Sequence, residues 1–238
     1  MAPTVVFLFD VDNTLLDNDQ VIADLRQHLQ HVVGSAGEQG YWTIFERIRG
    51  ELGYADYLGA LQRYRLEYPH DPRVLTVSRF LINYPFAERL FSQALDVVAH
   101  VKQWGQPVIL SDGDVVFQPR KIERSGLLDA VDGRALIYIH KEQALDDVEL
   151  RYPADRYVLV DDKVRILTSI KSNWGARVTT VFPRQGHYAR EAEARADFPA
   201  PDLTIDRIGD LLKYDLGRLI AGGTKPDHGS PAGTLGPQ

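Results

Sequence analysis

The sequence predicts an α/β protein built on a parallel sheet, with an all-helical segment inserted after the first strand. Three observations lead to this prediction. Residues 5–9 are five consecutive apolar residues, mostly β-branched or aromatic, as in a strand buried on both faces. The next roughly 80 residues show helical periodicity instead. From Ala94 onward, helical and strand-like stretches alternate, which is typical of a parallel sheet.

In the segment between Asp17 and Leu90, apolar residues recur at the spacing of one helix face. The stretches with this spacing are 21–33, 41–52, 57–68 and 74–81. Gly34 separates the first stretch from the second. Before the last stretch, Asp71 and Pro72 have the pattern of an N-cap followed by a first-turn proline. We therefore expect a bundle of helices here, with no strand among them.

The rest of the chain predicts the sheet and its covering helices. Expected strands are 108–110, 135–139, 157–160, 178–182 and a short edge strand at 203–205. Expected helices are 95–104, 117–125, 142–150, 166–175 and 206–220. Residues 222–238 are rich in Gly and Pro and have almost no apolar side chain to bury, so we expect a disordered tail.

The composition narrows the function classes. With 238 residues the chain can bury a sizeable core, and 44% hydrophobic and 25% charged residues are ordinary for a globular protein. The net charge of -6 argues against a nucleic acid partner, because phosphate-backbone binding needs a positive surface. We expect no membrane span and no signal peptide. The absence of cysteine excludes disulfides and thiolate chemistry, and a cytoplasmic monomer or homodimer is expected.

Polar residues follow the predicted strands at the point where each strand ends. The sets are Asp10, Asp12 and Thr14 after the first strand, Ser111, Asp112 and Gly113 after the second, Lys141 after the third, and Asp161 and Asp162 after the fourth. The carboxyl ends of parallel strands form the edge at which open α/β sheets bind ligands. Carboxylates are costly to bury without a cation or strong donors. The pattern therefore predicts a site at this edge.

These four motifs, in this order, resemble those of the haloacid dehalogenase-like hydrolases. Asp10-Val11-Asp12-Asn13-Thr14 matches the Asp-x-Asp-x-Thr of the first motif. The resemblance implies a Rossmann-like three-layer core formed by residues 1–16 and 91–221. It also implies that residues 17–90 form a helical cap of type one, a lid that excludes water and contacts the substrate. Residues 222–238 lie outside both parts.

The resemblance also implies roles for individual residues. Asp10 would be the nucleophile that forms an aspartyl phosphate, and Asp12 the general acid and then base. Lys141 would offset charge on the nucleophile and the phosphate. Thr14, Ser111, Asp112 and Gly113 would bind the phosphate group of the substrate together with Lys141. The implied reaction is hydrolysis of a small phosphorylated metabolite.

Magnesium is the implied cofactor, because the site offers hard oxygen ligands only. By resemblance its ligands are the Asp10 carboxylate, the Asp12 backbone carbonyl and Asp162, with Asp161 as a second acidic member. Four carboxylates face one lysine in this set. A divalent cation makes such a cluster tolerable, and without one a carboxylate pKa should rise.

Single residues argue for or against the other activities that are known in this superfamily. Haloalkanoate dehalogenases lack the second aspartate of the first motif, so Asp12 disfavours that activity. Phosphonate-cleaving members use a cap lysine, and no lysine lies between Leu15 and Asp96. Phosphomutases share all four motifs and stay possible, as does a binding or regulatory module without turnover. One departure is Ile166, where many members carry a further acid.

A few further residues of the sequence are weaker candidates. His28 and His31 are three apart on an expected helix, and a solvated helix face explains them better than a metal site. His140, beside Lys141, is expected to be structural or exposed. Four arginines of the inserted segment are candidates for binding an anionic substrate tail, namely Arg47, Arg49, Arg63 and Arg65.

Overall fold

The computed structural model describes residues 4–189 and 198–221, and these contain one parallel sheet of six strands. The strands are β1 (Val5–Phe9), β2 (Gln106–Asp112), β3 (Ala135–Tyr138), β4 (Arg156–Val160), β5 (Val178–Pro183) and β6 (Leu203–Ile205). Their order is β3-β2-β1-β4-β5-β6, and every neighbouring pair is parallel. The predicted α/β class and parallel sheet are confirmed. β1 lies in the interior of the sheet, between β2 and β4.

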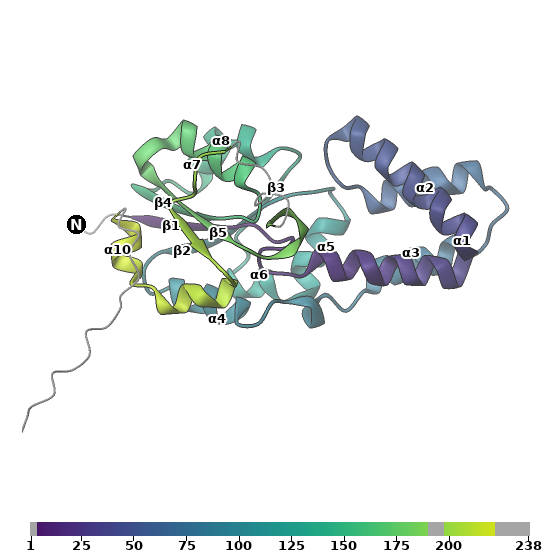
Figure 1. The fold of residues 1–238 in the computed structure, drawn as a ribbon, viewed down its shortest axis with the longest axis horizontal. Helices are drawn as coiled ribbons and strands as arrows, with labels where there is room; N and C mark the ends of the chain where they lie inside the picture. Colours follow the sequence, from purple (N-terminus) through teal and green to yellow (C-terminus); the bar gives the residue numbers. More distant parts are fainter. Residues whose placement is uncertain (1–3, 190–197, 222–238) are drawn as a thin grey trace, which may run out of the picture.

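Helices cover both faces of the sheet, which gives three layers (Figure 1). They are α4 (Ala94–Val101), α5 (Phe117–Arg124), α6 (Leu127–Ala130), α7 (Leu145–Arg151), α8 (Val164–Trp174) and α10 (Leu216–Ile220). Alternate residues of β1 enter the two cores. Phe7 and Phe9 pack in the core shared with α4 and α10, and Leu8 packs in the core shared with α7 and α8. Both faces of β1 are therefore buried, as its apolar run predicts.

The long elements of the inserted segment are all helices. They lie beyond the carboxyl ends of the strands (Figure 1). It contains α1 (Asn18–Leu52), α2 (Tyr57–Glu67) and α3 (Val74–Asn83), which we call the insert helices. The two connections between the sheet and these helices run side by side. Asp17 N donates to Arg89 O at 2.7 Å, and Phe91 N donates to Leu15 O at 2.9 Å. The chain thus leaves and re-enters the sheet at one place, next to the end of β1.

Two details of the insert differ from the sequence prediction. The first two predicted helices form one element, α1, which is kinked at Gly34, with φ 78° and ψ 171°. The last insert helix begins at Val74 rather than after Asp71. Asp71 Oδ1 instead accepts from Arg73 N at 3.0 Å, which stabilises a turn just before the helix.

Beyond β6 the predicted helix 206–220 is also wrong as a single element. The chain forms a short 3₁₀ helix, Ile208–Lys213, and then α10. The first ends at Lys213, and Asp215 caps the second, because its side chain accepts from the amides of Gly217 and Arg218. Three further 3₁₀ turns are Phe86–Arg89, Lys141–Gln143 and Gly175–Arg177. The predicted tail, 222–238, lies outside the described residues. No helix among those described combines the length and apolarity that crossing a bilayer requires.

Candidate active site

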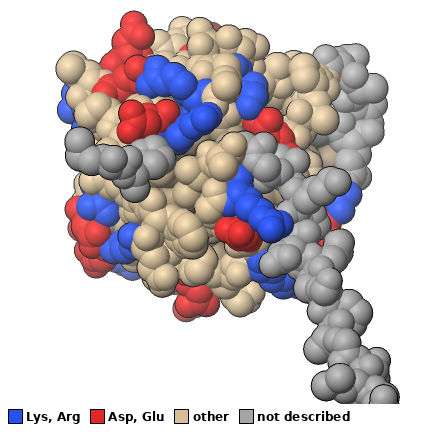
Figure 2. Space-filling view, turned by 90° about the vertical axis from the view of Figure 1, so that its left-hand side faces the viewer, with Lys and Arg blue, Asp and Glu red and all other residues tan. Residues whose placement is uncertain are grey.

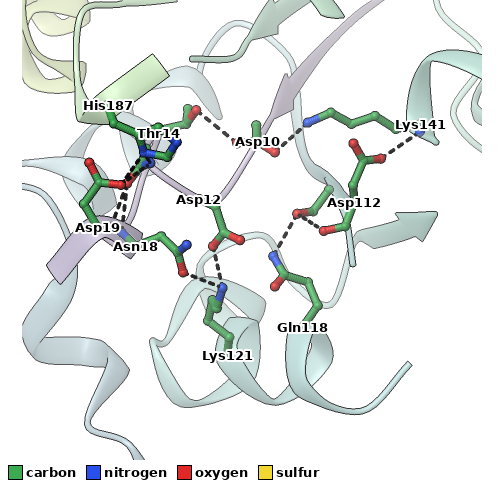
Figure 3. Close-up of polar contacts among 12 residues, drawn as sticks. Asp10, Asp12, Thr14, Asn18, Asp19, Asp112, Gln118, Lys121, Lys141 and His187 are labelled. Atoms are coloured by element: carbon green, nitrogen blue, oxygen red, sulfur yellow. Dashed lines mark hydrogen bonds and ion pairs between the residues drawn. The ribbon is translucent and has the colours of Figure 1, made fainter. Parts of the chain in front are cut away.

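The parallel order β2-β1-β4 brings the predicted strand-end residues together at one edge of the sheet. Asp10 follows β1, Ser111 and Asp112 end β2, and the pair Asp161 and Asp162 follows β4. Asp10, Ser111 and both residues of the pair are buried. Figure 3 shows Asp10 at the end of β1 with Lys141 reaching toward it from the neighbouring loop. Residues far apart in the chain therefore meet at one site.

Both carboxylate oxygens of Asp10 have partners. Oδ1 lies 2.5 Å from Lys141 Nζ, and Oδ2 accepts from the Thr14 hydroxyl at 3.1 Å. The Thr14 oxygen also accepts from Asp162 N at 3.1 Å. Thr14 thus joins the loop after β1 to the loop after β4 and fixes the rotation of Asp10. Whether its hydroxyl also binds a substrate phosphate stays a prediction.

Lys141 is fully buried and pairs with two aspartates. Its Nζ lies 2.5 Å from Asp10 Oδ1 and 2.7 Å from Asp161 Oδ2, and donates to Leu110 O at 3.2 Å. Burial alone would lower the pKa of Lys141, but the surrounding carboxylates outweigh burial and hold the pKa above its ordinary value. The ammonium charge therefore persists in the interior, directly beside Asp10.

Asp10, Asp161 and Asp162 form an acidic cluster whose ligand oxygens lie within 4.8 Å of one another. Neither carboxylate oxygen of the buried Asp162 has a hydrogen-bond partner. Desolvation raises the pKa of Asp162 well above its ordinary value and the pKa of Asp161 to about 6. An unpaired buried carboxylate is costly, and a hard divalent cation with oxygen ligands would satisfy it. The residues present therefore fit magnesium.

The β2 motif is held together by hydrogen bonds within the protein. Ser111 Oγ accepts from Gln118 Nε2 at 2.9 Å. Asp112 Oδ1 accepts from Lys141 N at 2.7 Å, so this carboxylate positions the loop that carries the lysine. Gly113 N donates to Tyr138 O at 3.0 Å, which engages its amide in the sheet. A role of these three residues in substrate binding stays a prediction.

Asp12 has a partner that the sequence reasoning missed. Its Oδ1 lies 2.6 Å from Nζ of Lys121, a fully buried residue of α5, and that Nζ also donates to Asn18 Oδ1 at 3.0 Å. In Figure 3 the Asp12 side chain points toward Lys121 and away from Asp10. A lysine in a helix is usually solvated, so the residue type alone did not predict that Lys121 is buried at the site. The one available signal is its spacing, since Gln118, Lys121 and Ile122 share the buried side of α5.

His187, which follows β5, also lies at the site, although no sequence motif predicted it. His187 Nδ1 lies 2.5 Å from Asp19 Oδ1, and Asp19 Oδ1 accepts from Asn13 Nδ2 at 3.0 Å. The close approach depends on Gly186, which has φ 69° and where an added Cβ would lie 2.5 Å from Asn13 Cβ. Gln185 Nε2 donates to the Thr14 carbonyl at 3.1 Å. The segment after β5 is thus fitted closely against the loop after β1.

A pocket of about 570 Å³ opens between the strand ends and the insert helices. Asp12, Asp112 and Gly113 line it on the sheet side, and aromatic residues of the insert such as Trp42 and Tyr57 line the other. Its wall also includes His140, Lys163 and His187. His140, which the sequence predicts to be structural or exposed, is partly exposed in this wall. The volume exceeds that of a phosphate group and leaves room for an organic tail.

The other candidates from the sequence lie in different surroundings. Among the four insert arginines, Arg49 lines the pocket and donates to Tyr188 Oη at 2.8 Å. Arg47 instead pairs with Glu67 at 2.7 Å on the surface. His28 stacks on Phe80 with ring centroids 4.1 Å apart, which accounts for it as a packing residue.

Several solved structures resemble this protein in fold. A solved haloacid dehalogenase-like hydrolase from Burkholderia xenovorans LB400 is 62% identical, with a TM-score of 0.84 over 89% of this chain and 98% of that one. A hydrolase of the same superfamily from Bacillus subtilis, solved bound to magnesium, is 16% identical, with a TM-score of 0.58 over 87% of this chain and 96% of that one.

An L-2-haloacid dehalogenase from Xanthobacter autotrophicus, with chloropropionic acid covalently bound, is 17% identical, with a TM-score of 0.58 over 87% of this chain and 96% of its own. At these low identities the last two structures show a shared fold alone. No curated protein matches the chain. The family model of haloacid dehalogenase-like hydrolases matches residues 4–172. The chain therefore belongs to the haloacid dehalogenase-like hydrolase family.

Proposed function

We propose that this hydrolase is a magnesium-dependent phosphatase of small phosphorylated metabolites and acts through an aspartyl phosphate at Asp10. The observation that carries the proposal is the buried acidic cluster around Asp10, in which Lys141 reaches only Asp10 and Asp161 of the three carboxylates. Asp162 is left with two unpaired oxygens. This arrangement suits a cation beside a carboxylate nucleophile.

In the proposed mechanism Asp10 attacks phosphorus, held in place by Lys141 and by the Thr14 hydroxyl. Asp12 first protonates the leaving alcohol and then deprotonates the water that attacks the acyl phosphate. Asp10, Asp161 and Asp162 would hold Mg²⁺, with the Asp12 carbonyl as a further proposed ligand. When bound, Mg²⁺ would screen the repulsion between the carboxylate and the phosphate.

The insert helices would act as the lid of this site. Their aromatic residues already form one wall of the pocket, so they would exclude water from the acyl phosphate and contact the organic part of the substrate. A small metabolite also suits the charge of the protein. At the end opposite the insert helices, acidic and basic side chains are interspersed rather than gathered by sign (Figure 2). Such a surface gives a nucleic acid no continuous positive face.

Dehalogenation is the competing activity among the relatives, and Asp12 speaks against it. This residue is present and lines the pocket. The buried acidic cluster of Asp10, Asp161 and Asp162 also has no use in a magnesium-independent dehalogenase. A phosphomutase would use the same residues and differ in returning the phosphate to the substrate. A regulatory module would bind ligand without turnover.

The decisive experiment compares products. The purified protein is incubated with an aryl phosphate, a panel of phosphorylated metabolites and 2-chloropropionate, each with excess Mg²⁺ or with chelator. We expect phosphate release that requires Mg²⁺ and is absent in Asp10→Asn, with no chloride release. Chloride release that persists in chelator would identify a dehalogenase. Isomerised sugar phosphate without net phosphate release would identify a mutase.

Heavy-oxygen water separates the two covalent mechanisms. Water attacks phosphorus in an acyl phosphate, so the label should appear in the released phosphate and not in the enzyme. In a dehalogenase-type ester, water attacks the carbonyl carbon and leaves the label in the aspartate. Mass spectrometry of the peptide that contains Asp10, after a single turnover, reads this difference directly. A labelled Asp10 would exclude the proposed phosphatase mechanism.

A further inference from the structure

Lys121 is the one charged side chain of α5 that is wholly buried. We propose that Lys121 is a positioning residue, which sets the orientation of the Asp12 carboxylate and ties it to the first residue of the insert helices, Asn18. The kinetic role rests on the proposed phosphatase function, in which Asp12 transfers protons. The structural role does not depend on that function, and the two can be tested separately.

The ammonium group of Lys121 contacts Asp12, Asn18 and the ring of Phe117. Its Nζ lies 2.6 Å from Asp12 Oδ1 and 3.0 Å from Asn18 Oδ1. The side chain has no solvent exposure, and the ammonium lies 5.4 Å from the centre of the Phe117 ring. A buried ammonium without partners is costly, so these contacts determine where the lysine sits. Conversely, the lysine determines where Asp12 sits, since no other charged partner of Asp12 is found in the described part of the chain.

Asn18 connects this pair to the insert. It is the first residue of α1, and its backbone amide donates to Asn13 Oδ1 at 3.0 Å. Its side chain also interacts with the Tyr57 hydroxyl of α2, where it opposes the rise in pKa that burial causes. The Tyr57 ring in turn lies 5.2 Å from that of Phe117, the first residue of α5. Lys121, Asn18 and Tyr57 thus form a continuous polar link from α5 to the insert.

Two arginines of α5 contact the end of α3 and the residue after it, where the chain leaves the insert helices. Arg120 Nε donates to Ile82 O at 3.4 Å, and Arg124 donates to the carbonyls of Asn83 and Tyr84 at 3.3 and 3.4 Å. One helix therefore touches the chain where it enters the insert and where it leaves. Through Lys121 the same helix holds Asp12. The position of the insert helices and the orientation of Asp12 are consequently linked through α5.

The expected effect on the reaction follows from the role of Asp12. If Lys121 acts through Asp12, replacing it misplaces the carboxylate without removing it. We expect Lys121→Met to lower kcat roughly 10–100-fold, with KM nearly unchanged, since supporting residues of this kind have effects of that size. The loss should be largest for alkyl phosphates, which need the proton, and smallest for aryl phosphates. Lys121→Arg keeps the charge and should restore part of the rate.

A double-mutant cycle tests this dependence. Lys121→Met should cause little further loss in a protein that already carries Asp12→Asn, because the group it positions is gone. Equal losses in both backgrounds would overturn the proposal. Lys102→Met, which removes a surface lysine paired with Asp132, is the matched control and should leave kcat unchanged.

Crystal structures of the variants provide a readout that does not need activity. In Lys121→Met the Asp12 side chain should leave its place against α5, and the contact with Asn18 should be lost. An unchanged Asp12 orientation would overturn the proposal, whatever the enzyme hydrolyses. If Lys121→Met fails to fold, Lys121→Gln, which also removes the charge but keeps a polar end, carries the same comparison. Failure of the wild type to release phosphate would remove the phosphatase function alone.

Discussion

At the residue scale, the loop after β1 places two aspartates in unlike surroundings. Asp10 is buried between Lys141 and Thr14, whereas the Asp12 side chain is 27% exposed and pairs with Lys121. Along an extended strand residues two apart point to the same face, but β1 ends at Phe9, so Asp10 and Asp12 lie in a loop in which their side chains can turn to different partners. Their proposed roles differ in the same way, and substitution can separate them.

Asp10→Asn removes the proposed nucleophile and should abolish turnover while the protein still folds, because the amide preserves the shape of the side chain. Asp12→Asn removes only proton transfer, which typically contributes 10²–10⁴-fold. The loss in Asp12→Asn should be least for aryl phosphates and greatest for alkyl phosphates. Rate against leaving-group pKa, measured for wild type and Asp12→Asn, checks this. Equal slopes in the two enzymes would remove Asp12 from the acid role.

Asp162 gives a prediction about stability. Its carboxylate is buried and unpaired, and desolvation raises its pKa well above the ordinary value of 3.8. The unfolded chain therefore loses this proton at lower pH than the folded chain, so the metal-free protein should lose stability as the pH rises above 3.8. In chelator at neutral pH, Asp162→Asn should raise the free energy of unfolding by roughly 1–3 kcal/mol.

Added Mg²⁺ should reverse this order. It should stabilise the wild type by about 2.7 kcal/mol at a hundredfold excess over its Kd, and should do much less for Asp162→Asn. Denaturant unfolding with and without Mg²⁺ measures both effects. Asp129→Asn, at an exposed position, is the control and should respond to Mg²⁺ as the wild type does. A metal response that is identical in Asp162→Asn would contradict the assignment of this ligand.

The sequence could reveal a site residue only where that residue lies at the end of a strand. Asp10, Ser111 and Asp161 were predictable because each lies at the end of an apolar run, and the sheet brings strand ends together. Lys121 and His187 were not, because one lies inside a helix and the other after an unremarkable turn. Their approach to the site is determined by packing between distant segments, which no local pattern encodes.

At the element scale, α1 contains a break that the sequence does predict. Gly34 has φ 78° and ψ 171°, in a region open to almost no residue except glycine. The helix continues on both sides, so the kink redirects its second half. By contrast, the predicted single helix 206–220 missed the turn at Asp215, since an aspartate among helix formers signals a cap only when the backbone around it is known.

Alanine substitution separates the kink from ordinary helix preference. Gly34→Ala should lower the free energy of unfolding by roughly 1–3 kcal/mol, because alanine is strained at this backbone conformation even though the space around it is open. Gly50→Ala, in the same helix and equally open, should raise it by about 0.5–1 kcal/mol. Thermal and denaturant unfolding measure both. Stabilisation by Gly34→Ala would mean that α1 runs straight in solution.

At the scale of the whole molecule, the sheet and its two apolar cores account for the described fold up to Ala221. The remaining residues are rich in Gly and Pro and offer almost nothing to either core. Truncation after Ala221 should therefore leave the melting temperature and turnover nearly unchanged. Differential scanning calorimetry and a phosphate-release assay on the shortened protein check this prediction. A large drop in melting temperature would show that the removed residues support the folded protein.

The interior position of β1 has a consequence for how the protein folds during its synthesis on the ribosome. Phe9 pairs with Ile109 on one side and with Val160 on the other. The strand that leads to the proposed nucleophile, Asp10, is therefore synthesised before both of its partner strands. At a synthesis rate of about 5–20 residues per second, this apolar strand stays unpaired for several seconds to tens of seconds. During that time it is a target for chaperones and for aggregation. The helices made in the meantime, α1 to α3, can form first because their contacts are local.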